Sequence, residues 1–161
     1  MRYFIDTEFI ESGPAYPINL ISIGMVSEDG RELYLELDGF PAGLANDWVT
    51  ANVLPHLLGG ESAVGRDDLK KAIIQFIGGD QKPEFWGYYA DYDWVVFAQI
   101  FGTMMDLPKG WPMYCRDLKQ WADQLGKPTL PEQTGTEHNA LNDARWNKQV
   151  YNFLNWLPTM D

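Results

Sequence analysis

Hydrophobic and polar positions along the chain follow two periods, one of two residues and one of three to four. The run Tyr3-Phe4-Ile5 is apolar throughout and predicts a strand buried on both faces. Ile18–Val26 predicts a second strand, and Arg31–Leu37 alternates between polar and apolar residues, as a half-exposed third strand does. Because Asp29-Gly30 between them favours a hairpin, these three strands are expected to form an antiparallel meander.

After residue 65, apolar residues recur mainly every three to four positions. Leu69, Ile73, Phe76 and Ile77 recur at helical spacing after Arg66-Asp67-Asp68, and Gly78-Gly79 would end that helix. Further along we expect a strand over Pro83–Tyr89, a helix over Trp94–Phe101, a strand over Met113–Cys115, a helix over Asp117–Leu125 and a long helix over Asn139–Leu157 that Pro158 ends. The stretch 38–65 is irregular, with a short helix-like segment around Trp48–Leu58.

This order predicts one α/β domain over residues 1–161. Its mixed five-stranded sheet would consist of the three-stranded antiparallel meander plus two further strands, flanked by helices. No repeat or linker divides the 161 residues, which suffice for one buried core.

Composition restricts the class of protein and the cellular location that fit this chain. No apolar stretch approaches the roughly 20 residues that span a bilayer, and the N-terminus lacks the pattern of a secretory signal. Cys115 is the single cysteine, so an internal disulfide and cysteine-based zinc sites are excluded, and a reducing cytoplasmic location is expected. The net charge of −11 argues against broad binding of long nucleic acid. It leaves room for an enzyme that acts on a strand end through metal ions.

Two carboxylates follow the first strand. Asp6 and Glu8 are two residues apart, so in a strand they point to the same face. Like charges at that separation need a counter-charge, and hard oxygen ligands favour Mg²⁺ or Mn²⁺. The alternative is that the strand has ended and both acids are solvated.

Two further clusters combine acids with helix starts. Asp91 and Asp93 stand at a strand-to-helix junction, where either could instead be only a helix cap. His138 and Asp143 are five residues apart, about 500° of rotation on a continuous helix, which leaves their side chains about 140° apart. They share a site if His138 lies at or before the first helical turn. Each cluster also has a bland interpretation as ordinary solvated surface.

Together the clusters resemble the DEDD exonuclease superfamily, in its histidine-containing branch. The matching motifs are D-T-E at Asp6-Thr7-Glu8, the aspartate in Y-A-D-Y-D, and H-x-A-L-x-D-A over 138–144. The family's middle motif commonly ends in an aromatic residue followed by Asp, which selects Asp93. An asparagine common in that motif is replaced by tyrosine here, so an alignment slip of two residues, to Asp91, stays open. FIDTEFI, LISIG and YYADYDW are most similar to the small stand-alone exoribonuclease AS type, related to ribonuclease T and associated with RNA and polyadenylate 3′ ends.

The resemblance implies a ribonuclease H-like fold and two-metal hydrolysis of single-stranded RNA, with poly(A) a candidate, from the 3′ end to nucleoside 5′-monophosphates. The implied cofactor is two Mg²⁺ ions, for which Mn²⁺ can substitute. The implied metal ligands are Asp6, Glu8, Asp93 and Asp143, with Asp6 bridging the ions and His138 as general base. We also expect substrate contacts from Thr7, Phe9 and Arg145.

Three other functions stay open. A DNA 3′–5′ exonuclease would use the same acids, an oligoribonuclease that finishes short fragments would suit the acidic surface, and a catalytically silent binding module would be expected to have lost one or more of them. The expected partner is an RNA 3′ end rather than a membrane. We also expect a homodimer, from the resemblance and because the last predicted helix is apolar over much of its circumference.

Overall fold

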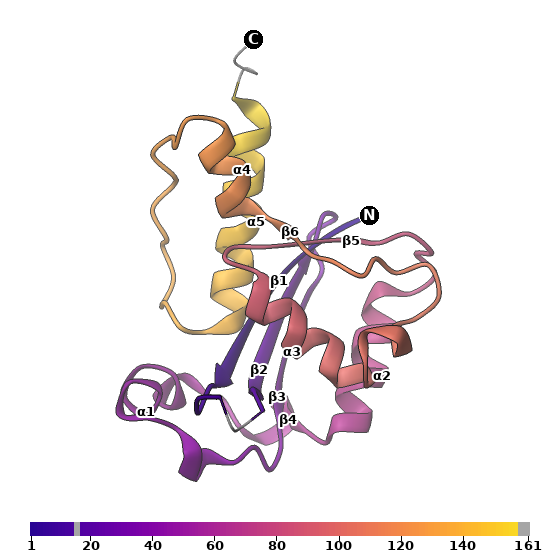
Figure 1. Ribbon diagram of the computed structural model, residues 1–161, viewed down its shortest axis with the longest axis vertical. Helices are drawn as coiled ribbons and strands as arrows, with labels where there is room; N and C mark the ends of the chain where they lie inside the picture. Colours follow the sequence, from indigo (N-terminus) through magenta and orange to yellow (C-terminus); the bar gives the residue numbers. More distant parts are fainter. Residues whose placement is uncertain (15–16, 158–161) are drawn as a thin grey trace.

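A mixed sheet of six strands in the order β4-β3-β2-β1-β5-β6 forms the centre of the computed structural model, which describes residues 1–14 and 17–157 (Figure 1). The first three strands form the predicted antiparallel meander, and the remaining pairs are parallel. The strands are β1 (Arg2–Ile10), β2 (Asn19–Ser27), β3 (Glu32–Leu37), β4 (Ala63–Val64), β5 (Glu84–Gly87) and β6 (Arg116–Asp117).

The predicted count of five strands is therefore wrong by one. The additional strand, β4, has two residues, too few to show an alternating pattern. The predicted strand Met113–Cys115 is also misplaced, because β6 begins one residue later, at Arg116. Two-residue strands are defined by the neighbour they pair with, here β3 for β4 and β5 for β6.

Helices cover both faces of the sheet. They are α1 (Asp47–Asn52), α2 (Arg66–Ile77), α3 (Asp91–Phe101), α4 (Leu118–Gln124) and α5 (Ala140–Trp156), with short 3₁₀ turns η1 (Ala42–Leu44), η2 (Leu54–His56), η3 (Gly60–Ser62) and η4 (Met104–Asp106). None of the helices in the described ranges is long and apolar enough to cross a membrane. Pro158, expected to end α5, lies outside the described residues.

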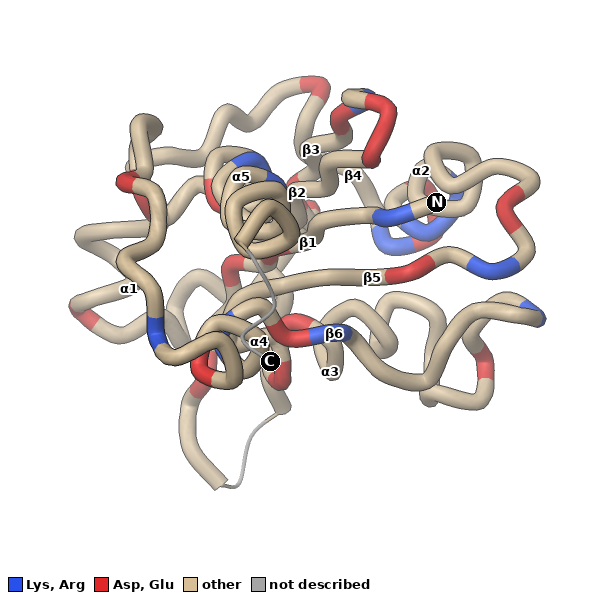
Figure 2. Tube along the Cα trace, turned by 90° about the horizontal axis from the view of Figure 1, so that it is seen from above, with Lys and Arg blue, Asp and Glu red and all other residues tan. Residues whose placement is uncertain are grey.

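The two helical layers follow from the alternation of side chains along the strands. Tyr3 and Ile5 point to the face where α2 and α3 pack, whereas Phe4 points to the face covered by α4 and α5. Figure 2 shows α5 and α2 on opposite sides of the row of strands. A third, smaller cluster joins Ile10 and Ile21 to Val49 and Val53, and so holds the α1 segment at one end of the sheet.

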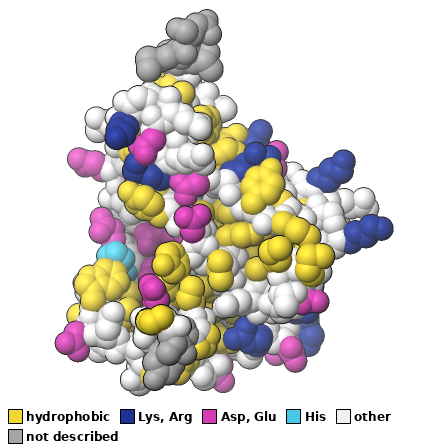
Figure 3. Space-filling model, in the orientation of Figure 1, with side chains coloured by type: hydrophobic (Ala, Val, Ile, Leu, Met, Phe, Trp, Pro, Cys, Tyr) yellow, Lys and Arg dark blue, Asp and Glu magenta, His cyan; other side chains and the backbone are white. Residues whose placement is uncertain are grey.

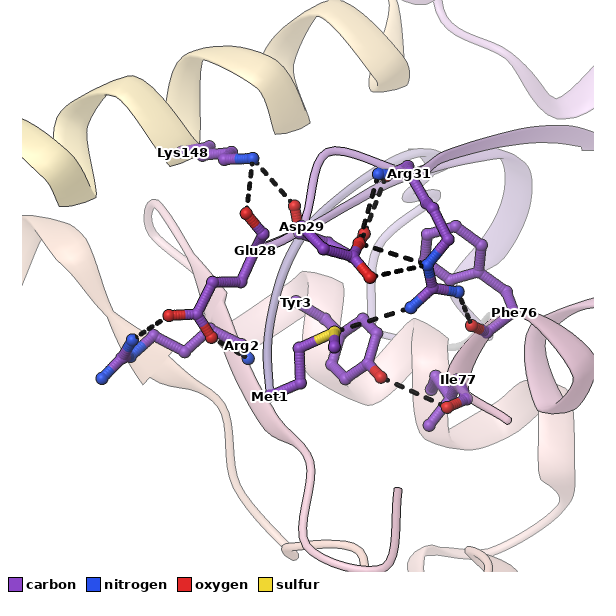
Figure 4. Close-up of polar contacts among 10 residues, drawn as sticks. Met1, Arg2, Tyr3, Glu28, Asp29, Arg31, Phe76, Ile77 and Lys148 are labelled. Atoms are coloured by element: carbon purple, nitrogen blue, oxygen red, sulfur yellow. Dashed lines mark hydrogen bonds and ion pairs between the residues drawn. The ribbon is translucent and has the colours of Figure 1, made fainter. Parts of the chain in front are cut away.

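At the other end of the sheet, the turn between β2 and β3 binds both helical layers (Figure 4). The Lys148 ammonium of α5 donates to the carbonyl oxygens of Ser27 and Glu28, at 2.9 and 3.1 Å. The Arg31 guanidinium donates to the carbonyl oxygen of Phe76 near the end of α2. These bonds fix α5 and α2 relative to the end of the sheet opposite the α1 segment.

The close approach of α5 to the sheet depends on Gly24 of β2. A Cβ atom at Gly24 would lie 2.1 Å from the carbonyl oxygen of Ala140, the first residue of α5. Gly24 is the cross-strand partner of Asp6. The start of α5 therefore lies against the sheet directly beside Asp6.

Candidate active site

Asp6 and Glu8 lie within β1, on the face that α5 covers. Their cross-strand partners on β2 are Gly24 and Ser22. The sequence predicted a strand ending near Ile5, but β1 continues to Ile10, so the acids are held by strand pairing rather than by a loop. The expectation that both side chains share one face therefore rests on regular strand geometry.

Strand β5 leaves β1 early and opens the edge where the site forms. β5 pairs with β1 only from Arg2 to Phe4 and then turns through residues 88–90 into α3. Tyr89 takes a left-handed backbone conformation (φ 54°) in this turn, and the Ala90 amide donates to Asp117 Oδ2 at 2.7 Å. Separation of parallel strands at their carboxyl ends is where ligands bind in open α/β sheets.

The turn directs Asp93 in the first turn of α3 toward β1. Its side chain is 7% exposed, and its Oδ1 accepts hydrogen bonds from the Thr7 amide at 2.8 Å and the Thr7 hydroxyl at 2.6 Å. Asp91 is exposed, and the N-cap position of α3 is Ala90. Of the two aspartates, Asp93 is the one that lies against the strand of Asp6.

His138 and Asp143 come together at the start of α5. The N-cap is Asn139, whose side chain accepts from the Asn142 amide, so His138 precedes the helix and Asp143 lies in its first turn. His138 has a left-handed backbone (φ 62°), and its amide donates to Asp143 Oδ2 at 3.1 Å. This is the arrangement that the five-residue spacing requires of a shared site.

Glu8 of β1 lies close to His138 and Asp143 at the start of α5. One ligand atom each from Glu8, His138 and Asp143 lies within 4.8 Å of the others, a spacing compatible with one metal ion. A cleft of about 170 Å³ beside them is lined in part by Asp6, His138 and Asp143. Figure 3 shows a histidine among acidic side chains on this face of the molecule, next to a large hydrophobic group.

Burial and mutual repulsion raise the pKa values of the acids. Burial, then the charges of Asp93, Asp143 and Glu8, raises the pKa of Asp6 well above its usual range. Burial and the neighbouring aspartates raise the pKa of Glu8 to about 8. The pKa of Asp93 is raised to about 6 by burial, although the Thr7 hydrogen bonds oppose the shift, and burial also raises the pKa of Asp143.

This electrostatic arrangement fits divalent cations. Within the described ranges, no lysine or arginine side chain forms an ion pair with the four acids. Four carboxylates that converge without a lysine or arginine partner either take up protons or bind cations. Their oxygen atoms are the ligand type that Mg²⁺ and Mn²⁺ prefer.

Three further residues of the site, Gln133, Asn147 and Trp48, were not predicted from the sequence. The Gln133 amide donates to Asp143 Oδ1, and the buried Asn147 donates to the Ile5 carbonyl oxygen at 2.9 Å. Asn147 could have been found, since it follows Asp143 by four residues on the same helix face. Gln133 stands in a loop without periodicity. Trp48 of α1 lies edge-on to the His138 ring, with centroids 4.7 Å apart, and no local pattern links residues so distant in sequence.

The three residues expected to contact substrate have other partners in the structure. Thr7 is 5% exposed and bonded to Asp93. Phe9 stacks on Tyr92, with ring centroids 5.7 Å apart. Arg145 forms a two-pronged ion pair with Glu32, with N–O distances of 2.9 and 2.6 Å. Contact between these residues and a substrate stays a prediction.

Fold and site together define the class: an α/β protein with an acidic cluster at the open edge of its sheet, spaced so that it could hold a metal ion. Residues 1–155 match the family model described as the 3′–5′ exoribonuclease Rv2179c-like domain. The chain belongs to this family.

Curated relatives agree with the match. The chain is 40% identical over 149 residues to the 3′–5′ exoribonuclease Rv2179c of Mycobacterium tuberculosis strain H37Rv, covering 90% of this chain and 88% of that protein. The protein named 3′–5′ exoribonuclease MT2234.1, of strain CDC 1551, gives the same identity and coverage.

A solved structure supports the fold. S. pombe Pop2p, in its Mg²⁺- and Mn²⁺-bound form, aligns with a TM-score of 0.60 at 13% identity, over 96% of this chain and 82% of that one. The likeness agrees with the ribonuclease H-like architecture that the sequence resemblance implied. The sheet has six strands where five were predicted.

Proposed function

We propose that the protein is a divalent-metal-dependent 3′–5′ exoribonuclease of the histidine-containing DEDD branch, acting on single-stranded RNA and releasing nucleoside 5′-monophosphates. The observation that carries the proposal is the convergence of Asp6, Glu8, Asp93 and Asp143 on one edge of β1, with His138 beside them. Family membership supports the 3′–5′ exoribonuclease activity. Polyadenylate 3′ ends are the substrate that the likeness to the AS type favours.

The four acids would hold two Mg²⁺ ions, for which Mn²⁺ can substitute. When bound, such ions polarise the attacking water and stabilise the departing 3′ oxygen. Burial and the charges of Asp93, Asp143 and Glu8 together raise the pKa of Asp6. Because Asp6 interacts with all three other acids, it is the acid that would contact both ions. Glu8 and Asp143 are the ligands proposed for one ion, and Asp93 for the other.

His138 is the proposed general base. An imidazole can accept a proton from water near neutral pH. Water attacks the terminal phosphorus, the bond to the 3′ oxygen breaks, and that oxygen takes up a proton, which leaves a shortened RNA with a free 3′ hydroxyl. His138 lines the cleft, where its backbone is left-handed and its ring lies edge-on to Trp48.

One observation favours a second candidate, an oligoribonuclease for very short fragments. The net charge of −11 weakens attraction of long polyanions, whereas a fragment of a few nucleotides carries few phosphates. The difference between the two candidates is one of substrate length and not of chemistry.

The test uses 5′-labelled single-stranded RNAs of 5 and 30 nucleotides and the matching DNAs. In Mg²⁺ we expect a ladder of products that shorten from the 3′ end, with RNA cleaved faster than DNA. EDTA and the Asp6→Asn substitution should each abolish this cleavage. His138→Ala should keep metal binding and lower the rate by about 10²–10⁴-fold, the usual contribution of general base catalysis.

The outcomes separate the candidates. Cleavage of the 5-mer alone would favour the oligoribonuclease. If DNA were cleaved faster than RNA, DNA would replace RNA as the proposed substrate. If neither nucleic acid is cut although metal binds, the silent binding module replaces the enzyme. Full activity of His138→Ala would remove His138 from its assigned role.

A further inference from the structure

Beyond Phe4, the edge of β1 is hydrogen-bonded by side chains in place of a strand. The Ile5 carbonyl oxygen accepts from the Asn147 amide at 2.9 Å, and the Thr7 amide donates to Asp93 Oδ1 at 2.8 Å. Buried backbone groups need partners, and these two side chains supply them after β5 has turned away. The strand edge and the acidic cluster are thus joined through Asp93.

Thr7 adds a second bond to the same carboxylate oxygen. Its hydroxyl lies 2.6 Å from Asp93 Oδ1, and both side chains are more than nine-tenths buried. A carboxylate oxygen has two lone pairs, so two donors from Thr7 occupy Oδ1. The carboxylate is held by Thr7 through one oxygen, and Oδ2 is the oxygen that would contact a cation.

These two hydrogen bonds restrict the rotation of the Asp93 carboxylate. The terminal torsion of an aspartate is broad, so an unanchored carboxylate samples many orientations. Thr7 therefore keeps the carboxylate of Asp93 in one orientation, as a metal ligand needs.

The position of Thr7 on the strand supports this role. Asp6 and Glu8 point to the face of α5, and the residue between them points to the face of α3, which carries Asp93. Its hydroxyl is engaged within the protein interior. Thr7 is thus placed to act on a neighbouring ligand.

We propose that Thr7 is a positioning residue that fixes the carboxylate of Asp93 as a ligand for one of two divalent cations. The inference rests on the proposed function of the site. The competing explanation is that the Thr7–Asp93 contact only joins β1 to α3, in which case its loss would change stability and leave cation affinity unaltered.

The experiment compares Thr7→Val, which keeps the shape and the backbone amide but loses the hydroxyl, with Thr7→Ser, which keeps the hydroxyl. Ser27→Ala is the control, because it removes a buried hydroxyl at the far end of the same sheet. Binding of Mn²⁺ is measured by isothermal titration calorimetry without RNA, and folding by thermal melting. Thr7→Ala serves as a second hydroxyl-free variant if Thr7→Val does not fold.

We expect Thr7→Val to weaken one of the two Mn²⁺ affinities by about tenfold, since loss of a partner of a ligand typically costs 10–100-fold. Thr7→Ser should recover most of the affinity, and Ser27→Ala should leave it unchanged. In RNA hydrolysis, Thr7→Val should lower kcat at limiting Mn²⁺ with KM for RNA unaltered, and excess Mn²⁺ should restore the rate.

Unchanged Mn²⁺ affinity in both hydroxyl-free variants would overturn the positioning role and leave the proposed function standing. Equal losses in Thr7→Val and Ser27→Ala would also overturn it, because the effect would then follow general destabilisation. Failure of the unmodified protein to bind Mn²⁺ would overturn the positioning role and the proposed metal dependence together.

Discussion

At the scale of single residues, the site places charges where burial and repulsion oppose them. The pKa values of Asp6, Glu8 and Asp93 are all raised, which means that each charged carboxylate destabilises the metal-free protein. The rest of the fold must offset that cost. Removing one of these charges should therefore separate stability from activity.

Asp6→Asn makes this separation testable. It keeps the side-chain shape and removes a buried carboxylate whose pKa is raised well above its usual range, so without metal at pH 8 we expect a gain of about 0.5–2 kcal/mol in the free energy of unfolding. Exonuclease activity should fall to background. Denaturant unfolding and the RNA assay measure the two effects.

The matched control is Asp91→Asn. It removes an exposed acid from the first turn of α3, where a negative charge stabilises the helix by about 0.3–1 kcal/mol. A small loss of stability with activity kept is expected, which would also decide between Asp91 and Asp93. If Asp6→Asn were less stable than the parent protein at pH 8, repulsion would not be the dominant effect at Asp6.

At the scale of elements, the site depends on how closely α5 approaches β2. Helix α5 carries Asp143 and begins two residues after His138, whereas Asp6 lies on β1 opposite Gly24. The absence of a side chain at Gly24 allows the backbone at Ala140 to touch the sheet. One glycine thus sets the distance between the two halves of the site.

Gly24→Ala should force these halves apart. Its Cβ would lie 2.1 Å from the Ala140 carbonyl oxygen, and backbone atoms must shift to make room. We expect a loss of stability of about 1–3 kcal/mol, as for other overpacked sites, and weaker Mn²⁺ binding. Gly43→Ala is the control, since a Cβ there meets nothing within 4 Å. Unchanged Mn²⁺ affinity in Gly24→Ala would show that the site tolerates displacement of α5.

At the scale of the whole molecule, the raised pKa values make stability depend on pH and metal together. A carboxyl group whose pKa is higher in the folded than in the unfolded protein favours folding at low pH. That contribution is complete below about pH 4 and is lost as pH rises through the folded-state values, about 6 for Asp93 and about 8 for Glu8.

We therefore expect the melting temperature of the metal-free protein to fall between pH 5 and pH 8. Mg²⁺ or Mn²⁺ binds the ionised carboxylates, so the stabilisation it gives should be larger at pH 8 than at pH 5. Differential scanning fluorimetry with EDTA or with metal measures both trends. A stabilisation by metal that did not change with pH would contradict binding through these acids.

The homodimer stays a prediction, and the structure changes the argument for it. Much of the apolar surface of α5 is used within the chain, since Val150, Tyr151 and Leu154 pack with Phe4 in the core. Trp156 at the end of the helix is 81% exposed. The width of the apolar face is therefore explained without a partner.

Much of the fold followed from local patterns. The meander of β1, β2 and β3, the helix α2 and the helix α5 were each signalled by residues within one segment. The short strands β4 and β6 were not, because a two-residue strand is defined by its neighbour. Strand β1 was predicted too short because the charges of Asp6 and Glu8 interrupt its apolar run, although pairing with β2 continues past them.

The sequence by itself determined the order of the longer strands and helices and the residues proposed for the acidic cluster, since spacing and side-chain chemistry are local properties of the chain. Only the tertiary structure decided what each of these residues touches. It bonded Thr7 to Asp93, paired Arg145 with Glu32 and brought Trp48 to His138. Such contacts join segments far apart in the chain, and they depend on where β5 leaves β1 and how closely α5 approaches Gly24, which packing of the whole molecule sets.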